Sequence, residues 1–116
     1  MGRIFMSRPS LMSLTIKYFT RRGYEVKRLN DSDEALTRPK FDFLVSKREA
    51  IHPVRVKEWN RTVGVNVVIN MDQAAQGSSF SNPILVAEKF SEHAKAYANR
   101  RGIILVTRSE ILRSLQ

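Results

Sequence analysis

The stretch that decides the fold runs from Phe41 to Trp59 and reads FDFLVSKREAIHPVRVKEW. Apolar and polar residues alternate on both sides of a short polar segment, which predicts a β-hairpin. Side chains alternate between the two faces of a strand, so a turn with an even number of residues gathers the apolar ones on one face. That face would carry Phe41, Phe43, Val45, Val54 and Val56. A one-residue slip would turn Asp42 into the core, and the apolar pattern therefore fixes the register.

The same register places Asp42 on the opposite face of the hairpin, beside Arg55 and Lys57. A carboxylate next to a lysine is a candidate for chemistry, because the two groups can hold a metal ion and stabilise developing charge. The alternative is a cross-strand ion pair worth about 0.2–1 kcal/mol, with no role beyond stability. The residues alone leave both interpretations open.

Length and composition indicate one globular domain over residues 1–116. The chain is 42% hydrophobic and 27% charged, and it contains no cysteine. No apolar run approaches the roughly 18 residues that span a bilayer, and the first residues lack the pattern of a signal peptide. We therefore expect a cytoplasmic protein without disulfides, thiolate metal sites or a membrane partner.

Net charge is the strongest global signal. Twenty lysines and arginines against eleven acids give a formal charge of +9 and a pI near 10.5. Such an excess on a small domain favours binding to polyanions, although a solvated basic surface is the alternative. The expected nucleic-acid contacts are Arg21, Arg22, Lys27, Arg28 and Arg61.

The rest of the chain predicts a mixed sheet with helices on both sides. Before the hairpin we expect a helix from Ser7, as N-cap, to Arg22, a strand from Tyr24 to Leu29, and a polar loop from Asn30 to Pro39. After it, residues 63–76 carry both strand and helix signals. A buried strand PILVA, a helix from Ser91 to Gly102, a buried strand IILVT and a helix from Ser109 to Leu115 follow. The strand–helix–strand unit predicts parallel strands and an α/β or α+β class.

Four segments resemble the Mrr-type restriction endonuclease-like domain, a branch of the PD-(D/E)xK nuclease superfamily. They are GYEVKRLND (23–31), FDFLV (41–45), VRVKEWNRTVGVNVV (54–68) and ILVAEKFSEHAKAYANRRGIILV (84–106). The resemblance extends from about Leu11 to the C-terminus. It implies a restriction endonuclease-like fold, a central mixed β-sheet flanked by helices, and it favours a helix over residues 63–76.

The resemblance also implies hydrolysis of DNA phosphodiesters with Mg²⁺ or Mn²⁺. Carried over, Asp42 is a metal ligand, the Val56 carbonyl is a second ligand, and Lys57 is the catalytic cation. The family pattern has an acid or amide at position 55, and this chain has Arg55 there. A guanidinium has no acceptor atom and stays charged, so Arg55 cannot be that ligand. Either another residue supplies the ligand, or metal binding is lost and Arg55 pairs with Asp42 or with a phosphate.

A missing ligand can be supplied from elsewhere in the chain. The candidates are Asp72 and Gln73 on the following helix, Glu25 on the first strand, and the loop acids Asp31, Asp33 and Glu34.

Three functions follow from these residues. The first is a metal-dependent DNA endonuclease with a degenerate site, acting as a homodimer. The second is a catalytically inactive nucleic-acid-binding module of the same fold. The third is a metal-independent RNA endonuclease, because RRGYEVKR, FDFLV and a later histidine resemble the catalytic domain of tRNA-splicing endonucleases. His52 and Lys89 would then be the partners of a tyrosine.

Overall fold

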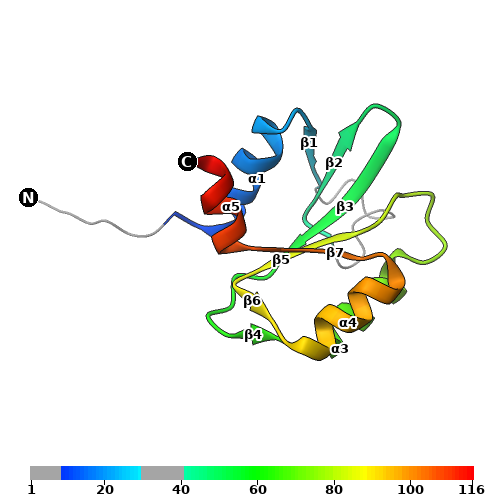
Figure 1. Ribbon diagram of the computed structural model, residues 1–116. Helices are drawn as coiled ribbons and strands as arrows, with labels where there is room; N and C mark the ends of the chain where they lie inside the picture. Colours follow the sequence, from blue (N-terminus) through cyan, green and yellow to red (C-terminus); the bar gives the residue numbers. More distant parts are fainter. Residues whose placement is uncertain (1–8, 30–40) are drawn as a thin grey trace, which may run out of the picture.

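The computed structural model describes residues 9–29 and 41–116, which form a mixed sheet between two layers of helices (Figure 1). The predicted loop from Asn30 to Pro39 lies outside the described residues. In the described part of the chain the main sheet has the order β1-β2-β3-β5-β7. The bounds are β1 Glu25–Arg28, β2 Phe43–Lys47, β3 Ala50–Val56, β5 Ile84–Ala87 and β7 Ile104–Thr107. The first three strands are antiparallel, and β3, β5 and β7 are parallel. The parallel pairing of β5 with β7 confirms the predicted strand–helix–strand unit.

The hairpin has the predicted register. Phe43 lies opposite Val54, and Lys47 lies opposite Ala50, so the turn has two residues, Arg48 and Glu49. Four of the five predicted apolar side chains lie in one buried cluster. The fifth prediction was wrong, because Phe41 packs in the cluster on the other face. The chain bends at Asp42, and strand alternation ends there.

Helices α1 (Leu11–Arg21) and α5 (Arg108–Leu115) cover one face of the sheet. The N-cap of α1 is Ser10, whose hydroxyl accepts a hydrogen bond from the Ser13 amide at 3.0 Å. The prediction of Ser7 as the cap was wrong. Ser10 is the serine whose hydroxyl reaches the N3 amide, which is what an N-cap does.

Helices α3 (Val65–Ala75) and α4 (Glu92–Arg101) cover the other face. Residues 63–76 thus form a helix, as the resemblance implied, despite their β-branched composition. The caps of α4 are confirmed: the Ser91 hydroxyl accepts from the Ala94 amide, and Gly102 adopts the left-handed conformation with φ of 74°. Alanine at this position would be strained, and its Cβ would lie 2.9 Å from the Asn82 amide nitrogen.

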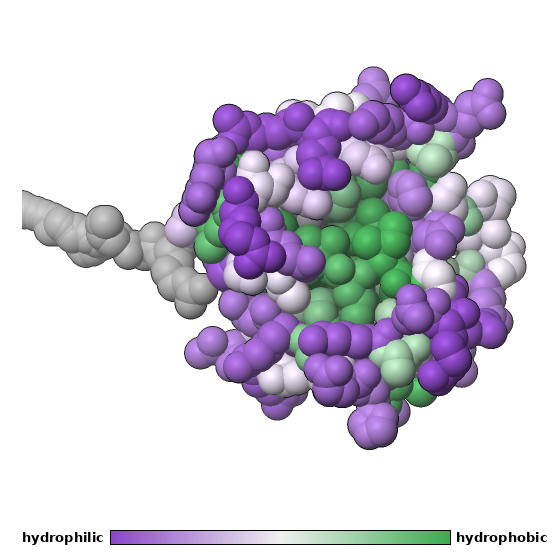
Figure 2. All heavy atoms as spheres, viewed as in Figure 1, coloured by the Kyte–Doolittle hydropathy of each residue, from purple (hydrophilic) through white to green (hydrophobic). Residues whose placement is uncertain are grey.

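Two features of the sheet were not predicted. A short parallel pair joins β4 (Thr62–Val63) and β6 (Lys89–Phe90). Strand β7 forms an edge of the sheet, so Ile104 is 40% exposed and the prediction that IILVT is fully buried was wrong. On the face seen in Figure 2, apolar side chains gather at the centre inside a ring of hydrophilic ones.

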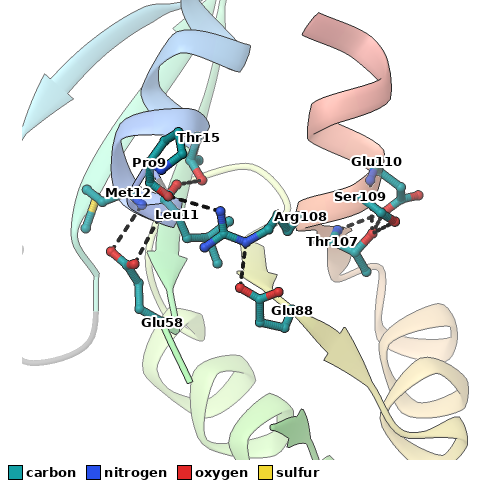
Figure 3. Close-up of polar contacts among 10 residues, drawn as sticks. All are labelled: Pro9, Leu11, Met12, Thr15, Glu58, Glu88, Thr107, Arg108, Ser109 and Glu110. Carbon is teal, nitrogen blue, oxygen red and sulfur yellow. Dashed lines mark hydrogen bonds and ion pairs between the residues drawn. The ribbon is translucent and has the colours of Figure 1, made fainter. Parts of the chain in front are cut away.

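The start of α1 is tied to the ends of two strands (Figure 3). The Glu58 carboxylate, two residues after β3, accepts hydrogen bonds from the amides of Leu11 at 2.9 Å and Met12 at 3.2 Å. Arg108 bonds Glu88 at 2.6 Å and the carbonyl of Pro9 at 3.1 Å. These contacts satisfy helix-end groups that would otherwise lack partners. No helix in the described part of the chain could cross a membrane.

Candidate functional site

The candidate site lies where β2 begins and β3 ends. The backbone amide of Asp42 donates to the Val54 carbonyl at 2.8 Å, which continues the hairpin ladder by one bond. The side chain then turns back, and its Oδ2 accepts a hydrogen bond from the Val56 amide at 2.7 Å. Because the chain bends at Asp42, its carboxylate lies beside the last residue of β3 and is not buried within the sheet.

Arg55 is the charged partner of this carboxylate. The distance from its Nε to Asp42 Oδ2 is 4.0 Å, and the two side chains are 28% and 32% exposed. A pair this long and only partly buried contributes about 1 kcal/mol or less to stability. The sequence prediction that Asp42 and Arg55 are neighbours on the face of the hairpin is consistent with this geometry.

Lys57 lies on the same face, one alternation further. Its amide donates to the Val86 carbonyl at 2.8 Å, which fixes the chain just beyond β3 against β5. Its Nζ lies 4.4 Å from the centre of the Trp59 ring, and the guanidinium of Arg61 lies at the same 4.4 Å. Trp59 also packs against the buried cluster under α3 and α4. One indole ring thus contacts two cations and also the core.

A small pocket opens beside these residues. Its volume is about 110 Å³, and it is lined by Arg55, Lys57, Val67, Asn70, Met71 and Leu85. Arg55 and Leu85 are register neighbours on β3 and β5, and Lys57 follows β3. The remaining three side chains, Val67, Asn70 and Met71, come from one face of α3. Sequence analysis named Arg55 and Lys57 as site residues and did not name Leu85, Val67 or Met71. The one-turn spacing of Asn66 and Asn70 on α3 was the available signal for Asn70.

Comparison with known protein families then decides what kind of domain this is. The Mrr_cat family, described as restriction endonuclease, matches residues 5–115. The chain belongs to the Mrr-type restriction endonuclease family. The resemblance stated from the sequence is thus confirmed, and it covers nearly the whole chain. No curated protein matches the chain significantly.

Two solved structures share the fold of this Mrr-type domain. A protein of unknown function, AF1548, superposes with a TM-score of 0.73 at 16% identity, covering 89% of this chain and 64% of its own. The EndoMS–dsDNA2 complex gives a TM-score of 0.52 at 15% identity, covering 89% of this chain and 46% of its own. The Mrr-type domain thus spans less than two thirds of each. The restriction endonuclease-like fold is confirmed.

Among the described residues of this Mrr-type domain, two oxygen donors lie where the resemblance assigns Mg²⁺: the Asp42 carboxylate and the Val56 carbonyl. A strand residue directs its N–H and C=O toward the same edge, so the Val56 carbonyl faces the Asp42 side. That leaves one carboxylate and one carbonyl, with the Arg55 cation 4.0 Å from the carboxylate. No group of three or more acids, histidines or cysteines suited to a metal occurs among residues 9–29 and 41–116. Mg²⁺ is commonly held by one or two carboxylates together with waters and substrate phosphates, so these two donors would need waters or a phosphate beside them. The nearby charge of Arg55 opposes a bound cation.

Asp72, one candidate for the missing ligand, instead binds two side chains of α4. Its Oδ2 accepts hydrogen bonds from the Tyr97 hydroxyl at 2.8 Å and from the Arg101 Nε at 2.9 Å, and the residue is 7% exposed. The hydrogen bond to Asp72, and then burial, raise the pKa of Tyr97 above its ordinary value. Asp72 lines a different pocket from the one beside Lys57.

Glu25, the other candidate, is far from Asp42 along β1. Leu29 bonds the Asp42 carbonyl, whereas Glu25 pairs with Ser46. Glu25 and Leu29 are four residues apart, a distance of about 13 Å along a strand. That is too far for Glu25 and Asp42 to bind one ion. The acids Asp31, Asp33 and Glu34 lie outside the described residues.

The five predicted nucleic-acid contacts do not form one patch. Arg61 stacks on the same indole as Lys57, and Arg28 lies opposite Phe43, next to the Asp42 bend. Lys27 is exposed on β1. Arg21 donates to the Leu115 carbonyl at 3.0 Å, and Arg22 lies over the Tyr18 ring at 5.1 Å, both at the far end of α1. Arg61 and Arg28 are therefore the two nearest the candidate site.

The residues required for a metal-independent RNA endonuclease are not brought together. The ring of His52 bonds the Asn82 carbonyl at 2.7 Å and lies edge-on to Tyr24 at 6.4 Å. Val54, two residues after His52, pairs with Ile84, whereas Lys89 lies five residues beyond Ile84. His52 thus lies before the start of β5 and Lys89 lies on β6 beyond its end, so the whole of β5, about 13 Å long, separates them along the sheet. This geometry does not support the third function.

Proposed function

We propose that this Mrr-type domain acts on DNA by holding the phosphate backbone at the strand end formed by Asp42, Arg55 and Lys57. The proposal is supported by membership of a restriction endonuclease family, by the formal charge of +9, and by likeness to a structure solved as a complex with double-stranded DNA. A basic domain of this size gains affinity for DNA by releasing counterions.

The observation that carries the proposal is the arginine beside the only acid at the site that the structure describes. Arg55 lies 4.0 Å from Asp42, and Lys57 follows on the same face. Two cations and one anion give this strand end a net charge of +1 where a metal site requires a negative one. A guanidinium binds phosphate oxygens in a bidentate manner, so the site suits phosphate without a metal ion. Binding of DNA without hydrolysis is therefore the function that the geometry supports best.

A second candidate is metal-dependent cleavage with Mg²⁺ or Mn²⁺, as the family resemblance implies. It is favoured by the direction of the Val56 carbonyl, which faces the Asp42 carboxylate, and by a lysine at the family position. It requires at least one further oxygen ligand, for which Asp31, Asp33 and Glu34 are the remaining candidates.

The experiment that separates the two candidates uses one supercoiled plasmid and three proteins. Binding is measured over a range of salt concentrations, and nicking is measured with Mg²⁺ or Mn²⁺, with and without chelator. The proteins are the wild type, Lys57→Ala, and Lys95→Ala as a matched control, because Lys95 is an exposed lysine paired with Glu92 on α4.

We expect wild-type protein and the Lys95 variant to bind the plasmid equally and to leave it uncut. Lys57→Ala should bind about fivefold more weakly, with a salt slope lower by about 1. Metal-dependent nicking that Lys57→Ala abolishes would instead establish the second candidate. Absence of DNA binding by the wild type would refute both.

Two further expectations complete the proposal. A homodimer would place two such strand ends on one duplex, and light scattering of the protein with and without DNA measures this directly. A matched RNA duplex in the binding experiment distinguishes DNA from RNA as the partner.

A further inference from the structure

The pocket beside Arg55 and Lys57 has two kinds of wall. Arg55, Lys57 and Asn70 bring hydrogen-bond donors from β3, from the residue after it, and from α3. Val67, Met71 and Leu85 form the rest of the lining, and Leu85 and Met71 belong to the buried cluster under α3. Arg55 and Asn70 thus lie on β3 and α3, both of which pack against the core. Lys57 directly follows β3, and its amide bonds the Val86 carbonyl of β5.

The pocket is large enough for a small anion. Its volume is about 110 Å³. A single water needs only about 10–15 Å³ in the same measure, so the space holds several waters. A single tetrahedral anion therefore fits it.

Charge distinguishes the two kinds of phosphate that DNA offers. A phosphodiester within a strand carries one negative charge and two unshared oxygens. A terminal phosphomonoester carries a charge of about −1.5 to −2 near neutral pH and has three strong acceptor oxygens. Two cationic side chains and one amide match the monoester in charge and in the number of donors.

Geometry favours the same partner. A phosphodiester inside a duplex is attached to nucleotides on both sides, so it stays on the convex surface of the DNA. A terminal phosphate is attached by one bond only, and it can enter a recess in a protein wall. Lys57, one of the lining residues, lies over the Trp59 ring together with a second cation, Arg61, which can contact the adjoining backbone.

We propose that this pocket binds the terminal phosphomonoester of a DNA end or nick, with Arg55, Lys57 and Asn70 as its donors. The proposal rests on the function proposed above and narrows its substrate from DNA in general to DNA with phosphorylated ends. Phosphate binding here requires no metal ion, since the guanidinium of Arg55 and the ammonium of Lys57 supply the positive charge.

The test compares one short duplex in four forms: with 5′-phosphates, with 3′-phosphates, with hydroxyl ends, and nicked with a phosphate at the nick. A closed circular plasmid serves as DNA without ends. Affinity is measured by fluorescence anisotropy for the short forms and by gel retardation for the plasmid, at one salt concentration and with chelator present.

We expect at least one phosphorylated form to bind about tenfold more tightly than the hydroxyl form, the effect of one added charge-assisted hydrogen bond. Inorganic phosphate, at an ionic strength matched with chloride, should remove this preference, because it offers the same tetrahedral anion. The 5′ and 3′ arms identify which terminus supplies the group.

Two asparagine variants assign the preference to the pocket. Asn70→Ala removes one donor, and Asn66→Ala is the matched control, because Asn66 is an exposed asparagine one turn earlier on the same helix and outside the pocket. Alanine is a good helix former, so neither change should unfold α3. The tenfold preference should fall to about threefold or less in the Asn70 variant and remain in the Asn66 variant.

The outcomes separate this proposal from the broader one. Equal binding of phosphorylated and hydroxyl duplexes, with the plasmid still bound, would overturn the end preference and leave DNA binding intact. A preference that Asn70→Ala leaves unchanged would overturn the assignment to this pocket. Failure to bind any of the DNAs would overturn the proposed function itself.

Discussion

Two aspartate–arginine pairs in this domain differ in the exposure of the carboxylate and in the distance between the two charged groups. The Asp72 carboxylate is 10% exposed and lies 2.9 Å from Arg101, with a second hydrogen bond from Tyr97. The Asp42 carboxylate is 32% exposed and lies 4.0 Å from Arg55. The first pair joins α3 to α4, and the second lies at a strand end beside a pocket. The close, buried pair stabilises the contact between two helices, whereas the longer, partly exposed pair lies where a ligand can reach it.

Removing the charge of Asp72 is the most direct test of whether the buried pair stabilises the fold. Asp72→Asn should lower the free energy of unfolding by about 2 kcal/mol, because two hydrogen bonds to a buried carboxylate are weakened. The loss should stay below the 3–5 kcal/mol of a fully buried pair, since Arg101 is about half exposed. Urea unfolding measures the change.

Glu92→Gln is the matched control for this prediction, because the Glu92–Lys95 pair is exposed and should contribute less than about 0.5 kcal/mol. The folded Asp72 variant should keep the DNA affinity of the wild type. A variant that is fully stable but no longer acts on DNA would mean that Asp72 is part of the functional site.

Glu58 lies between these extremes and tests whether a helix cap behaves like the buried pair. Its carboxylate accepts from two amides at the start of α1, a helix with no acid of its own in the first turn. Glu58→Gln keeps an acceptor and removes the charge, so we expect a loss of about 1 kcal/mol. Thermal unfolding measures it, with Glu110→Gln in the capping box of α5 as a second example of the same chemistry. No loss of stability would show that the α1 contact is incidental.

The hairpin could be predicted from the sequence because the residues that determine it lie close together in the chain. Alternation over FDFLV and a turn of fixed parity are sufficient to place Asp42 and Arg55 on one face, and Ser91 and Gly102 are recognisable caps. The role of Asp72 could not be predicted, because its partners Tyr97 and Arg101 lie 25 and 29 residues away on another helix. Contacts between helices depend on packing, which periodicity does not specify.

The same limit explains the remaining differences. The strands β4 and β6 have two residues each, too few to show any alternation. The exposure of Ile104 follows from the position of β7 at a sheet edge, which depends on strand order and not on the apolar run itself. At the candidate site, the strand residues were predictable from spacing, but the wall contributed by Met71 of α3 required the fold.

Substitution of Asp42 should change DNA affinity more than stability, whereas substitution of Asp72 should change stability more than DNA affinity. Asp42→Asn keeps an oxygen for the Val56 amide, so stability should change by less than about 1 kcal/mol. Removing a negative charge next to Arg55 should strengthen DNA binding by about threefold and steepen its salt dependence. Anisotropy titrations of wild type and variant at two salt concentrations check both effects. A weaker complex would contradict the proposal, and loss of a metal-dependent cleavage activity would support the second candidate function.

The smallest effect expected is a shift in the titration of Tyr97. The hydrogen bond to Asp72 is the main cause of its raised pKa, followed by burial and the Asp72 charge, while Arg101 and Arg100 act in the other direction. Because the folded-state pKa exceeds the ordinary value near 10, the linked stability is present below about pH 10 and is lost as pH rises through the folded-state pKa. Asp72→Asn should therefore lower the pKa of Tyr97 toward its ordinary value, as ultraviolet absorbance of tyrosinate can show, with Tyr97→Phe identifying the signal against the other two tyrosines. Identical titration curves for wild type and Asp72→Asn would mean that the contact between Asp72 and Tyr97 is not maintained in solution, and the contrast between the two aspartates would then rest on Arg101 alone.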